Sequence, residues 1–491
     1  MNPFKRLASQ TVIYGVPTIV GRLLTQFLTP LYTYVYTTGE YGVVASMYAY
    51  VSFLLVLLTY GMETALFRFS QSESNKGNVY STILLSLIST SVLFIAIVSW
   101  YANSIAHAIK LNHHPEYIIW FAIILATDAV SAIVFAKLRE QNKAFRFALI
   151  KSLNISIWIF LNVFFIWFCA RIYSNPQSIF FSIVEKFYNP SIGIGYIFIS
   201  NLIASCITLL LLLPDMFRIQ FYFDKIVWKR MMIYAIPLLI AGMAGMINET
   251  MDRILLTYLL PENEALSQAG IYSACYKVSI IMTVFIQTFR FAAEPFFFSH
   301  AKEKDAKQIY ADIMKYFSII CAFIFLGTMM NISWIQYFLG EPFRVGIKVV
   351  PVLLLANLCL GIFINQSIWY KLSGQTRYGA YLAIMGAIIT LVLNFYWIPR
   401  IGYMGSAWAT LICYASMMIV SYFMGSKQYP INYDLKRILG YITLSIFLFL
   451  AAQQITLASY VIDILIKNLM IVVFLGIVFI FEKKEINLML K

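Results

Sequence analysis

Long apolar segments dominate this chain and constrain its fold more than any other feature. Each is long enough to cross a hydrocarbon core of about 30 Å as a helix. We expect fourteen spans, at residues 9–34, 42–67, 79–101, 116–137, 147–169, 192–213, 231–260, 269–298, 311–339, 346–370, 378–398, 402–424, 437–457 and 460–481. Of the 491 residues, 61% are hydrophobic and 12% are charged, whereas soluble proteins are about 25% charged. The sequence therefore predicts an all-α polytopic membrane protein without a large soluble domain.

Basic residues are distributed unevenly between the connections of these spans. With the N-terminus inside, the inner connections and tails with their adjoining span ends hold 25 Lys and Arg residues, and the outer connections with their adjoining span ends hold six. Because basic loops stay on the cytoplasmic side, both termini are predicted to be cytoplasmic. The net charge of +14 is spread over short loops rather than gathered in one basic domain, which argues against a nucleic-acid partner.

Short internal sequence repeats divide the chain into halves. The pairs of similar segments are 13–17 and 233–237, 137–143 and 371–377, and 194–196 and 401–403. Six spans separate the members of each pair, so we expect parallel repeats related by a pseudo-two-fold axis along the membrane normal. The predicted parts are an N-terminal lobe at 1–230, a C-terminal lobe at 231–425 and an appended helix pair at 426–491. A substrate site is expected between the two lobes.

Charged residues inside two central spans are the main functional signal. The span 231–260 carries Asn248, Glu249, Asp252 and Arg253 within roughly 140° of one helix face, and the span 269–298 carries Lys277, Arg290 and Glu294. Ionisable groups at such depth are costly and usually face a bundle interior or a water-filled cavity. We therefore expect a polar pathway lined by buried charges. Two alternatives stay open: a private Glu249–Arg253 ion pair, and a Lys277 side chain that extends to the headgroups.

Arg22 and Asp128 lie near the middle of the spans 9–34 and 116–137. An arginine stays charged in the cell and can hold a phosphate with two parallel hydrogen bonds. The candidates for a cationic cavity that binds a diphosphate headgroup are Arg22, Arg253, Lys277 and Arg290. The candidates for ion coupling or counter-charge are Asp128, Glu249, Asp252 and Glu294. An ion pair between Arg22 and Asp128 is the structural alternative.

The fourteen-span pattern and two short runs carry a family resemblance. GMETALFRF at 61–69 and FRFAAEPFFF at 289–298 resemble the polysaccharide-transport branch of the multidrug/oligosaccharidyl-lipid/polysaccharide (MOP) exporter superfamily, and in particular its Wzx-type O-antigen and capsule flippases. The resemblance implies a two-lobed helical bundle in the bacterial inner membrane. By alternating access, it would move undecaprenyl-diphosphate-linked oligosaccharide repeat units to the outer leaflet for surface polysaccharide biosynthesis. Implied partners are the lipid-linked glycan, membrane lipids and polysaccharide polymerase or assembly proteins, with no cofactor other than a coupling H+ or Na+.

Three other functional classes remain as alternatives. Lipid II flippases, which carry the peptidoglycan precursor, and drug or cation antiporters belong to the same superfamily. A membrane enzyme acting on lipid-linked glycans is the third class. The chain has no HExxH, GxSxG or GxxxxGK motif, and its longest predicted outer loop covers only 170–191. We therefore predict a transporter rather than an enzyme, and no metal site.

Overall fold

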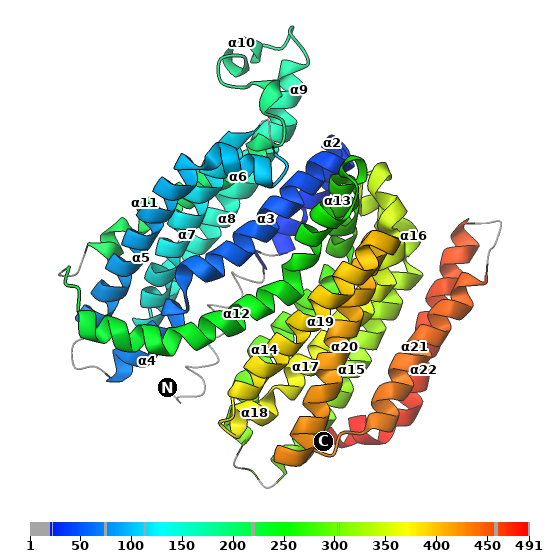
Figure 1. Ribbon diagram of the computed structural model, residues 1–491. Coiled ribbons are helices and arrows are strands. Elements are labelled where there is room, and N and C mark those ends of the chain that lie inside the picture. The colour runs from blue at the N-terminus through cyan, green and yellow to red at the C-terminus, as the bar shows by residue number, and fades with distance from the viewer. Residues whose placement is uncertain are drawn as a thin grey trace. The chain divides into compact units, whose positions relative to one another are not determined.

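The computed structural model describes residues 20–21, 23–72, 76–111, 114–217, 221–301, 303, 305–455 and 460–489 (Figure 1). These residues form helices joined by short connections, and no strand occurs among them. The predicted all-helical class is therefore confirmed. The chain divides into two compact units, one ending at Gly270 and one beginning at Ile271. The lobe boundaries at 230 and 425, the helix count of fourteen and the two-fold relation between lobes stay predictions.

Thirteen helical stretches of the described residues are long and apolar enough to cross a membrane. They correspond to the predicted spans from the second to the fourteenth. Residues 9–19 and 22 of the predicted first span, 9–34, lie outside the described residues. Its described part, 20–21 and 23–34, is helical apart from a turn at residue 27 and includes most of α2.

The first unit is built around α7, whose span is the most buried of the thirteen. Its helices are α2 (Leu28–Val35), α3 (Thr38–Thr59), α4 (Met62–Ser72), α5 (Lys76–Trp100), α6 (Ala102–Ala108), α7 (Pro115–Glu140), α8 (Ala144–Val163), the π-helix η1 (Phe164–Cys169), α9 (Ala170–Tyr173), α10 (Phe181–Val184), η2 (Pro190–Ile192), α11 (Gly195–Met216) and α12 (Lys225–Leu259). α7 packs against α3, α5, α8 and α11. Small side chains at Ala122, Ala126 and Ala129 leave room for neighbouring helices to approach closely.

Local sequence signals set the ends of α3. The Thr37 side chain accepts from the Glu40 backbone N–H while the Glu40 carboxylate accepts from the Thr37 N–H, forming a capping box. The helix ends at Tyr60 and Gly61, which both have positive φ, 31° and 73°. A Cβ at Gly61 would also lie 3.2 Å from the Ala235 carbonyl oxygen. Glycine therefore fits both the backbone conformation and the close approach of α12.

The two charged central spans differ from prediction in their bounds. The N-cap of α12 is Asp224, whose carboxylate accepts from the backbone N–H groups of Ile226 and Val227, so the helix begins before residue 231. α12 continues through Pro237, and Figure 1 shows it bending along its length. The predicted continuous span 269–298 is wrong: α13 (Glu262–Val278) and α14 (Ile280–His300) are separated at Ser279. The Ser279 hydroxyl donates to the Tyr276 carbonyl, a local bond that competes with the regular helical pattern.

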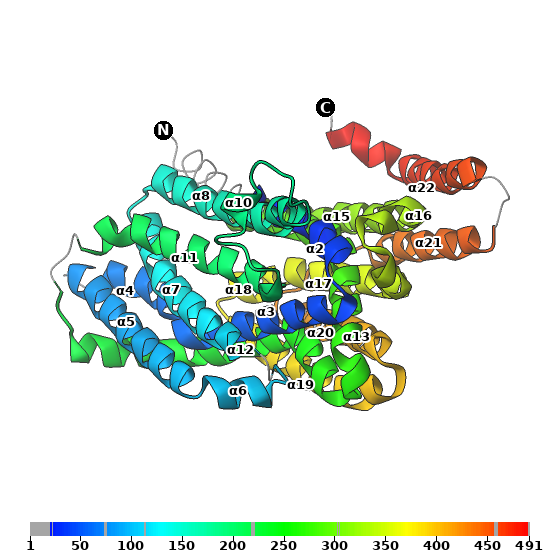
Figure 2. The same ribbon diagram turned by 90° about the horizontal axis from the view of Figure 1, so that it is seen from above.

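The second unit surrounds the largely buried α15 and α17. Beyond α14 it comprises α15 (Ala306–Met330), α16 (Ile332–Ile335), η3 (Gln336–Phe338), η4 (Glu341–Val349), α17 (Val350–Gln366), α18 (Ile368–Leu372), α19 (Arg377–Ile401), α20 (Tyr403–Gln428), α21 (Leu435–Gln453) and α22 (Tyr460–Met489). α17 packs against α14, α15 and α20. α21 and α22 run side by side and contact α15 (Figures 1 and 2). The α22 span is the least buried of the thirteen, as expected for a helix that faces lipid.

Candidate functional site

The predicted site residues fall into three groups in the structure. Asp128, Glu249, Asp252 and Arg253 belong to the first unit, and Lys277, Arg290 and Glu294 belong to the second. Arg22 lies outside the described residues.

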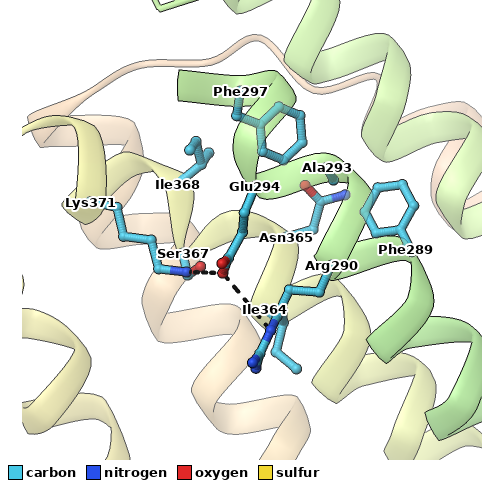
Figure 3. Close-up of a pocket in the computed structure, with 10 residues that line it drawn as sticks. All are labelled: Phe289, Arg290, Ala293, Glu294, Phe297, Ile364, Asn365, Ser367, Ile368 and Lys371. Carbon is cyan, nitrogen blue, oxygen red and sulfur yellow. Dashed lines mark hydrogen bonds and ion pairs between the residues drawn. The ribbon is translucent and has the colours of Figure 1, made fainter. Parts of the chain in front are cut away.

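A pocket of the second unit brings Arg290 and Glu294 together with Lys371. Arg290 and Glu294 lie one turn apart on α14, and Lys371 comes from α18. Lys371 Nζ lies 2.5 Å from Glu294 Oε1, and Arg290 Nε lies 3.9 Å from the same oxygen. Figure 3 shows the two cations approaching this carboxylate from different helices. Arg290 and Glu294 were candidates from the sequence, whereas Lys371 was missed.

The pocket also contains a buried amide with an unused donor. The side chain of Asn365 is 5% exposed, and its Nδ2 has no hydrogen-bond partner among the described residues. It lies at the end of α17, next to Ser367, where α17 gives way to α18. A buried donor without a partner is costly, and native proteins usually supply one as a protein group, water or ligand. Asn365 therefore offers an unused hydrogen-bond donor at this pocket.

The electrostatic balance of this pocket favours an anion. Among the described residues that line it, Arg290, Lys371 and Glu294 are the only ionisable ones, so the pocket carries a net charge of one positive unit. The Arg290, Glu294 and Lys371 side chains are 48%, 39% and 28% exposed. The cations are thus accessible rather than sealed in a core. An oxyanion can take the position now occupied by the glutamate oxygen, with hydrogen bonds from both cations.

A comparable ion pair occurs in the first unit. Arg139 Nη2, at the end of α7, lies 3.2 Å from Glu63 Oε1 on α4. The ends of α7 and α18 carry the echoed segments 137–143 and 371–377. Each unit therefore joins a glutamate to a cation at an end that the charge pattern predicts to be cytoplasmic. Glu63 belongs to the GMETALFRF run and Glu294 to the FRFAAEPFFF run.

The charges of α12 are arranged differently from the Glu249–Arg253 ion pair that was left open as an alternative. Arg253 Nη1 donates to the backbone carbonyl of Glu249 at 2.8 Å and lies 3.6 Å from Asp252 Oδ1. Asp252 is buried, whereas Glu249 is exposed. The expected burial of Glu249 is therefore wrong. The coupling roles of these residues stay predictions.

Asp128 lies inside the first unit, midway along α7. Its carboxylate interacts with the Ser205 hydroxyl and is attracted electrostatically by the positive charge of Lys151. Asp128 therefore has local partners whether or not it also meets Arg22. Lys277 is half-buried in the last turn of α13, two residues before the break at Ser279.

The sequence analysis also missed a buried ionic cluster at the C-terminal helix pair. Glu482 of α22 is fully buried and contacts Lys315 of α15 at 2.8 Å. Arg437 of α21 lies 3.2 Å from the same carboxylate, and the Tyr441 hydroxyl donates to it at 2.7 Å. The cluster joins three helices. Only the position of Lys315 inside the predicted span 311–339 was a signal for it.

No group of three or more His, Cys, Asp or Glu side chains in the described part of the chain could hold a metal ion. All six cysteines are free thiols and are buried or half-buried.

Comparisons with known proteins give a family and a fold. The family model described as polysaccharide biosynthesis protein matches residues 7–301. No curated protein matches the chain in sequence. A solved structure of the lipid II flippase MurJ, in its inward closed conformation, is 14% identical with a TM-score of 0.74 and covers 97% of this chain and 100% of that chain.

Transporters of a second family have the same fold. An outward-facing structure of a multidrug resistance MATE family transporter of the MOP superfamily is 13% identical with a TM-score of 0.60, and covers 90% of this chain and 99% of that chain. An inward-facing structure of such a transporter is 13% identical with a TM-score of 0.57, and covers 90% and 96% of the two chains.

Proposed function

We propose that this chain, which belongs to the polysaccharide biosynthesis protein family, is a flippase for oligosaccharide repeat units linked to undecaprenyl diphosphate. It is a multi-pass membrane protein with the fold of the MOP superfamily. We place it in the bacterial inner membrane with both termini in the cytoplasm, because of the 25 to six distribution of basic residues. Its activity is transport rather than covalent conversion of the glycan.

The observation that carries this proposal is the meeting of Arg290, Lys371 and Asn365 around one pocket. A diphosphate presents several oxygen acceptors and at least two negative charges to such a site. Arg290 offers a forked pair of donors, Lys371 a mobile point charge and Asn365 a neutral donor. The sugar chain differs between cargoes and the polyprenyl tail extends away from the headgroup, whereas the diphosphate is common to all of them. A site for that group serves every cargo of this class.

Glu294 supplies the counter-charge of the two cations before the cargo binds. Its carboxylate satisfies Lys371 and Arg290 when no diphosphate is present. An entering diphosphate exchanges with the glutamate, so that the cations are never left without a counter-charge. Protonation of Glu294, or binding of a cation to it, favours that exchange and supplies a route for coupling to H+ or Na+.

A lipid II flippase is the second candidate. The fold match to the lipid II flippase structure over 97% of this chain favours it. Both cargoes carry an undecaprenyl diphosphate, so the Arg290–Lys371 pocket does not separate them.

Mass spectrometry of the lipid-linked intermediates in cells lacking the protein tests this proposal. We expect accumulation of undecaprenyl diphosphate carrying a complete repeat unit, together with loss of surface glycan. Accumulation of lipid II would instead support the second candidate. No change in either lipid pool would contradict both.

A further inference from the structure

The loop between α9 and α11 exposes apolar side chains at one end of the first unit. Figure 1 shows α9 and α10 projecting beyond the other helices of this unit. The exposed side chains, named here the outward face, are Ile179 (90% exposed), Phe180 (54%), Ile183 (59%) and Phe187 (48%). An apolar patch of this kind marks a site of contact with a membrane or with a protein. None of these residues was a candidate from the sequence.

The loop has a packed side opposite the outward face. Backbone bonds give the segment 180–188 helical turns, because the N–H groups of Val184 and Tyr188 donate to the carbonyls four residues earlier. At about 100° per residue, the last three residues of the outward face fall within roughly 60° of one another. Val184 points the other way and is 2% exposed, in a hydrophobic cluster that includes Ile172 and Tyr173. The turn is therefore held on the protein by one apolar side and presents a second apolar side.

The outward face continues the exposed apolar surface of α8. The Phe187 ring stacks on the ring of Phe164, with the ring centres 6.1 Å apart and the planes at 10°. Phe164 in turn stacks on Phe160 and Phe168, and both of these are exposed. The span that contains them is only 17% buried, as expected for a helix that faces lipid. Phe187 therefore borders the lipid-facing surface.

The length of this span places the loop at the membrane boundary. The helical stretch 144–173 has 30 residues and is about 45 Å long, whereas the hydrocarbon core is about 30 Å thick. Trp167 and Arg171 lie one turn apart near its end, with the guanidinium 5.9 Å from the indole ring. Tryptophan is enriched where hydrocarbon meets the headgroups. The loop therefore leaves the membrane near Trp167, and Phe187 brings it back to the same level.

We propose that the outward face inserts into the boundary between headgroups and acyl chains of the outer leaflet, and so anchors this end of the first unit. A lipid surface fits this face better than a protein partner, because the face is continuous with the lipid-facing side of α8. The exposed Lys186 lies in the same turn and can extend its ammonium to the lipid phosphates. The predicted topology selects the outer leaflet, and the insertion does not depend on the cargo.

Fluorescence quenching by nitroxide-labelled lipids tests the proposal. The full-length protein, with its six native cysteines replaced, carries the fluorophore NBD at Ile179→Cys or Ile183→Cys in vesicles of phosphatidylethanolamine and phosphatidylglycerol. Glu185→Cys is the matched control, since its exposed side chain lies about 200° around the turn from Ile183. A nitroxide at the start of the acyl chain should quench the two outward labels about threefold more strongly than the control, because interfacial apolar faces lie about 5–10 Å deep.

A second variant separates insertion from mere proximity to the membrane. Ile183→Asp, in the protein labelled at residue 179, should lower the quenching there to the level of the control, because a charge opposes insertion. Equal and weak quenching at residues 179, 183 and 185 would show that the outward face stays in water, as a face for a protein partner does, and would overturn the inference. Equally strong quenching at 183 and 185 would also contradict it, because no single face would then insert.

Discussion

Lys315 Nζ and Glu482 Oε2 lie 2.8 Å apart, with both side chains almost completely buried between α15 and α22. Arg437 and Tyr441 of α21 complete the environment of the carboxylate. At the other end of the α15–α22 contact, Asn331, which directly follows α15, and Asn468 of α22 donate to each other at 3.2 Å. Within the second unit, α22 is therefore joined to the α15 region by polar contacts near both of its ends.

Removing one partner of the Lys315–Glu482 pair should strongly destabilise the protein. Lys315→Met leaves a buried carboxylate with less compensation, and breaking such a pair costs about 3–5 kcal/mol. Lys315→Met combined with Glu482→Leu should recover much of that loss. Thermal unfolding of the purified proteins measures the effect, with the exposed Lys427→Met as control. A single variant as stable as the control would mean that the buried pair adds nothing.

Impermeant labelling of introduced cysteines tests the predicted topology. In a background with the six native cysteines replaced, Ser174→Cys and Asn263→Cys should react from outside intact cells. Asn142→Cys should react only after the cells are opened, because its connection between α7 and α8 is rich in basic residues. Labelling from outside at residue 142 but not at residue 263 would show that the protein has the opposite orientation in the membrane.

Neutralising Glu294 should strengthen anion binding at its pocket. Glu294→Gln removes the carboxylate that occupies Lys371 and Arg290. A half-exposed ion pair contributes about 0.2–1 kcal/mol, so the pyrophosphate affinity should rise about 1.4- to 5-fold. Calorimetric titration of the protein in nanodiscs measures this change. Weaker binding by Glu294→Gln would mean that the carboxylate organises the site instead of competing for it.

Ion coupling would depend on one of the carboxylates within the spans. We expect transport in vesicles to fall when the proton or sodium gradient is collapsed, and Asp128→Asn or Glu294→Gln to remove that dependence. Glu249→Gln is the informative comparison, since its side chain is exposed. Transport that is indifferent to both gradients would exclude coupling through these groups.

The sequence predicts the spans well because membrane insertion is a local property of about 20 consecutive residues. The shared face of Arg290 and Glu294 likewise follows from their spacing of four. Lys371 could not be assigned to them, because it lies 77 residues from Glu294 and only helix packing brings it near. The helix break at Ser279 could not be predicted, because it lies within an uninterrupted apolar segment. The lack of a partner for Asn365 Nδ2 is a property of the tertiary packing, which no local sequence pattern indicates.

The most direct measurement is reconstituted transport of a fluorescent undecaprenyl-diphosphate-linked glycan into proteoliposomes by Arg290→Gln and Lys371→Gln. Arg377→Gln, an exposed cation at the start of α19, is the matched control. We expect each pocket variant to retain its fold and lose most of its transport rate. Arg290→Lys should retain part of it, because the charge remains without the forked geometry. Full transport by the double variant Arg290→Gln with Lys371→Gln would contradict the assignment of this pocket to the diphosphate.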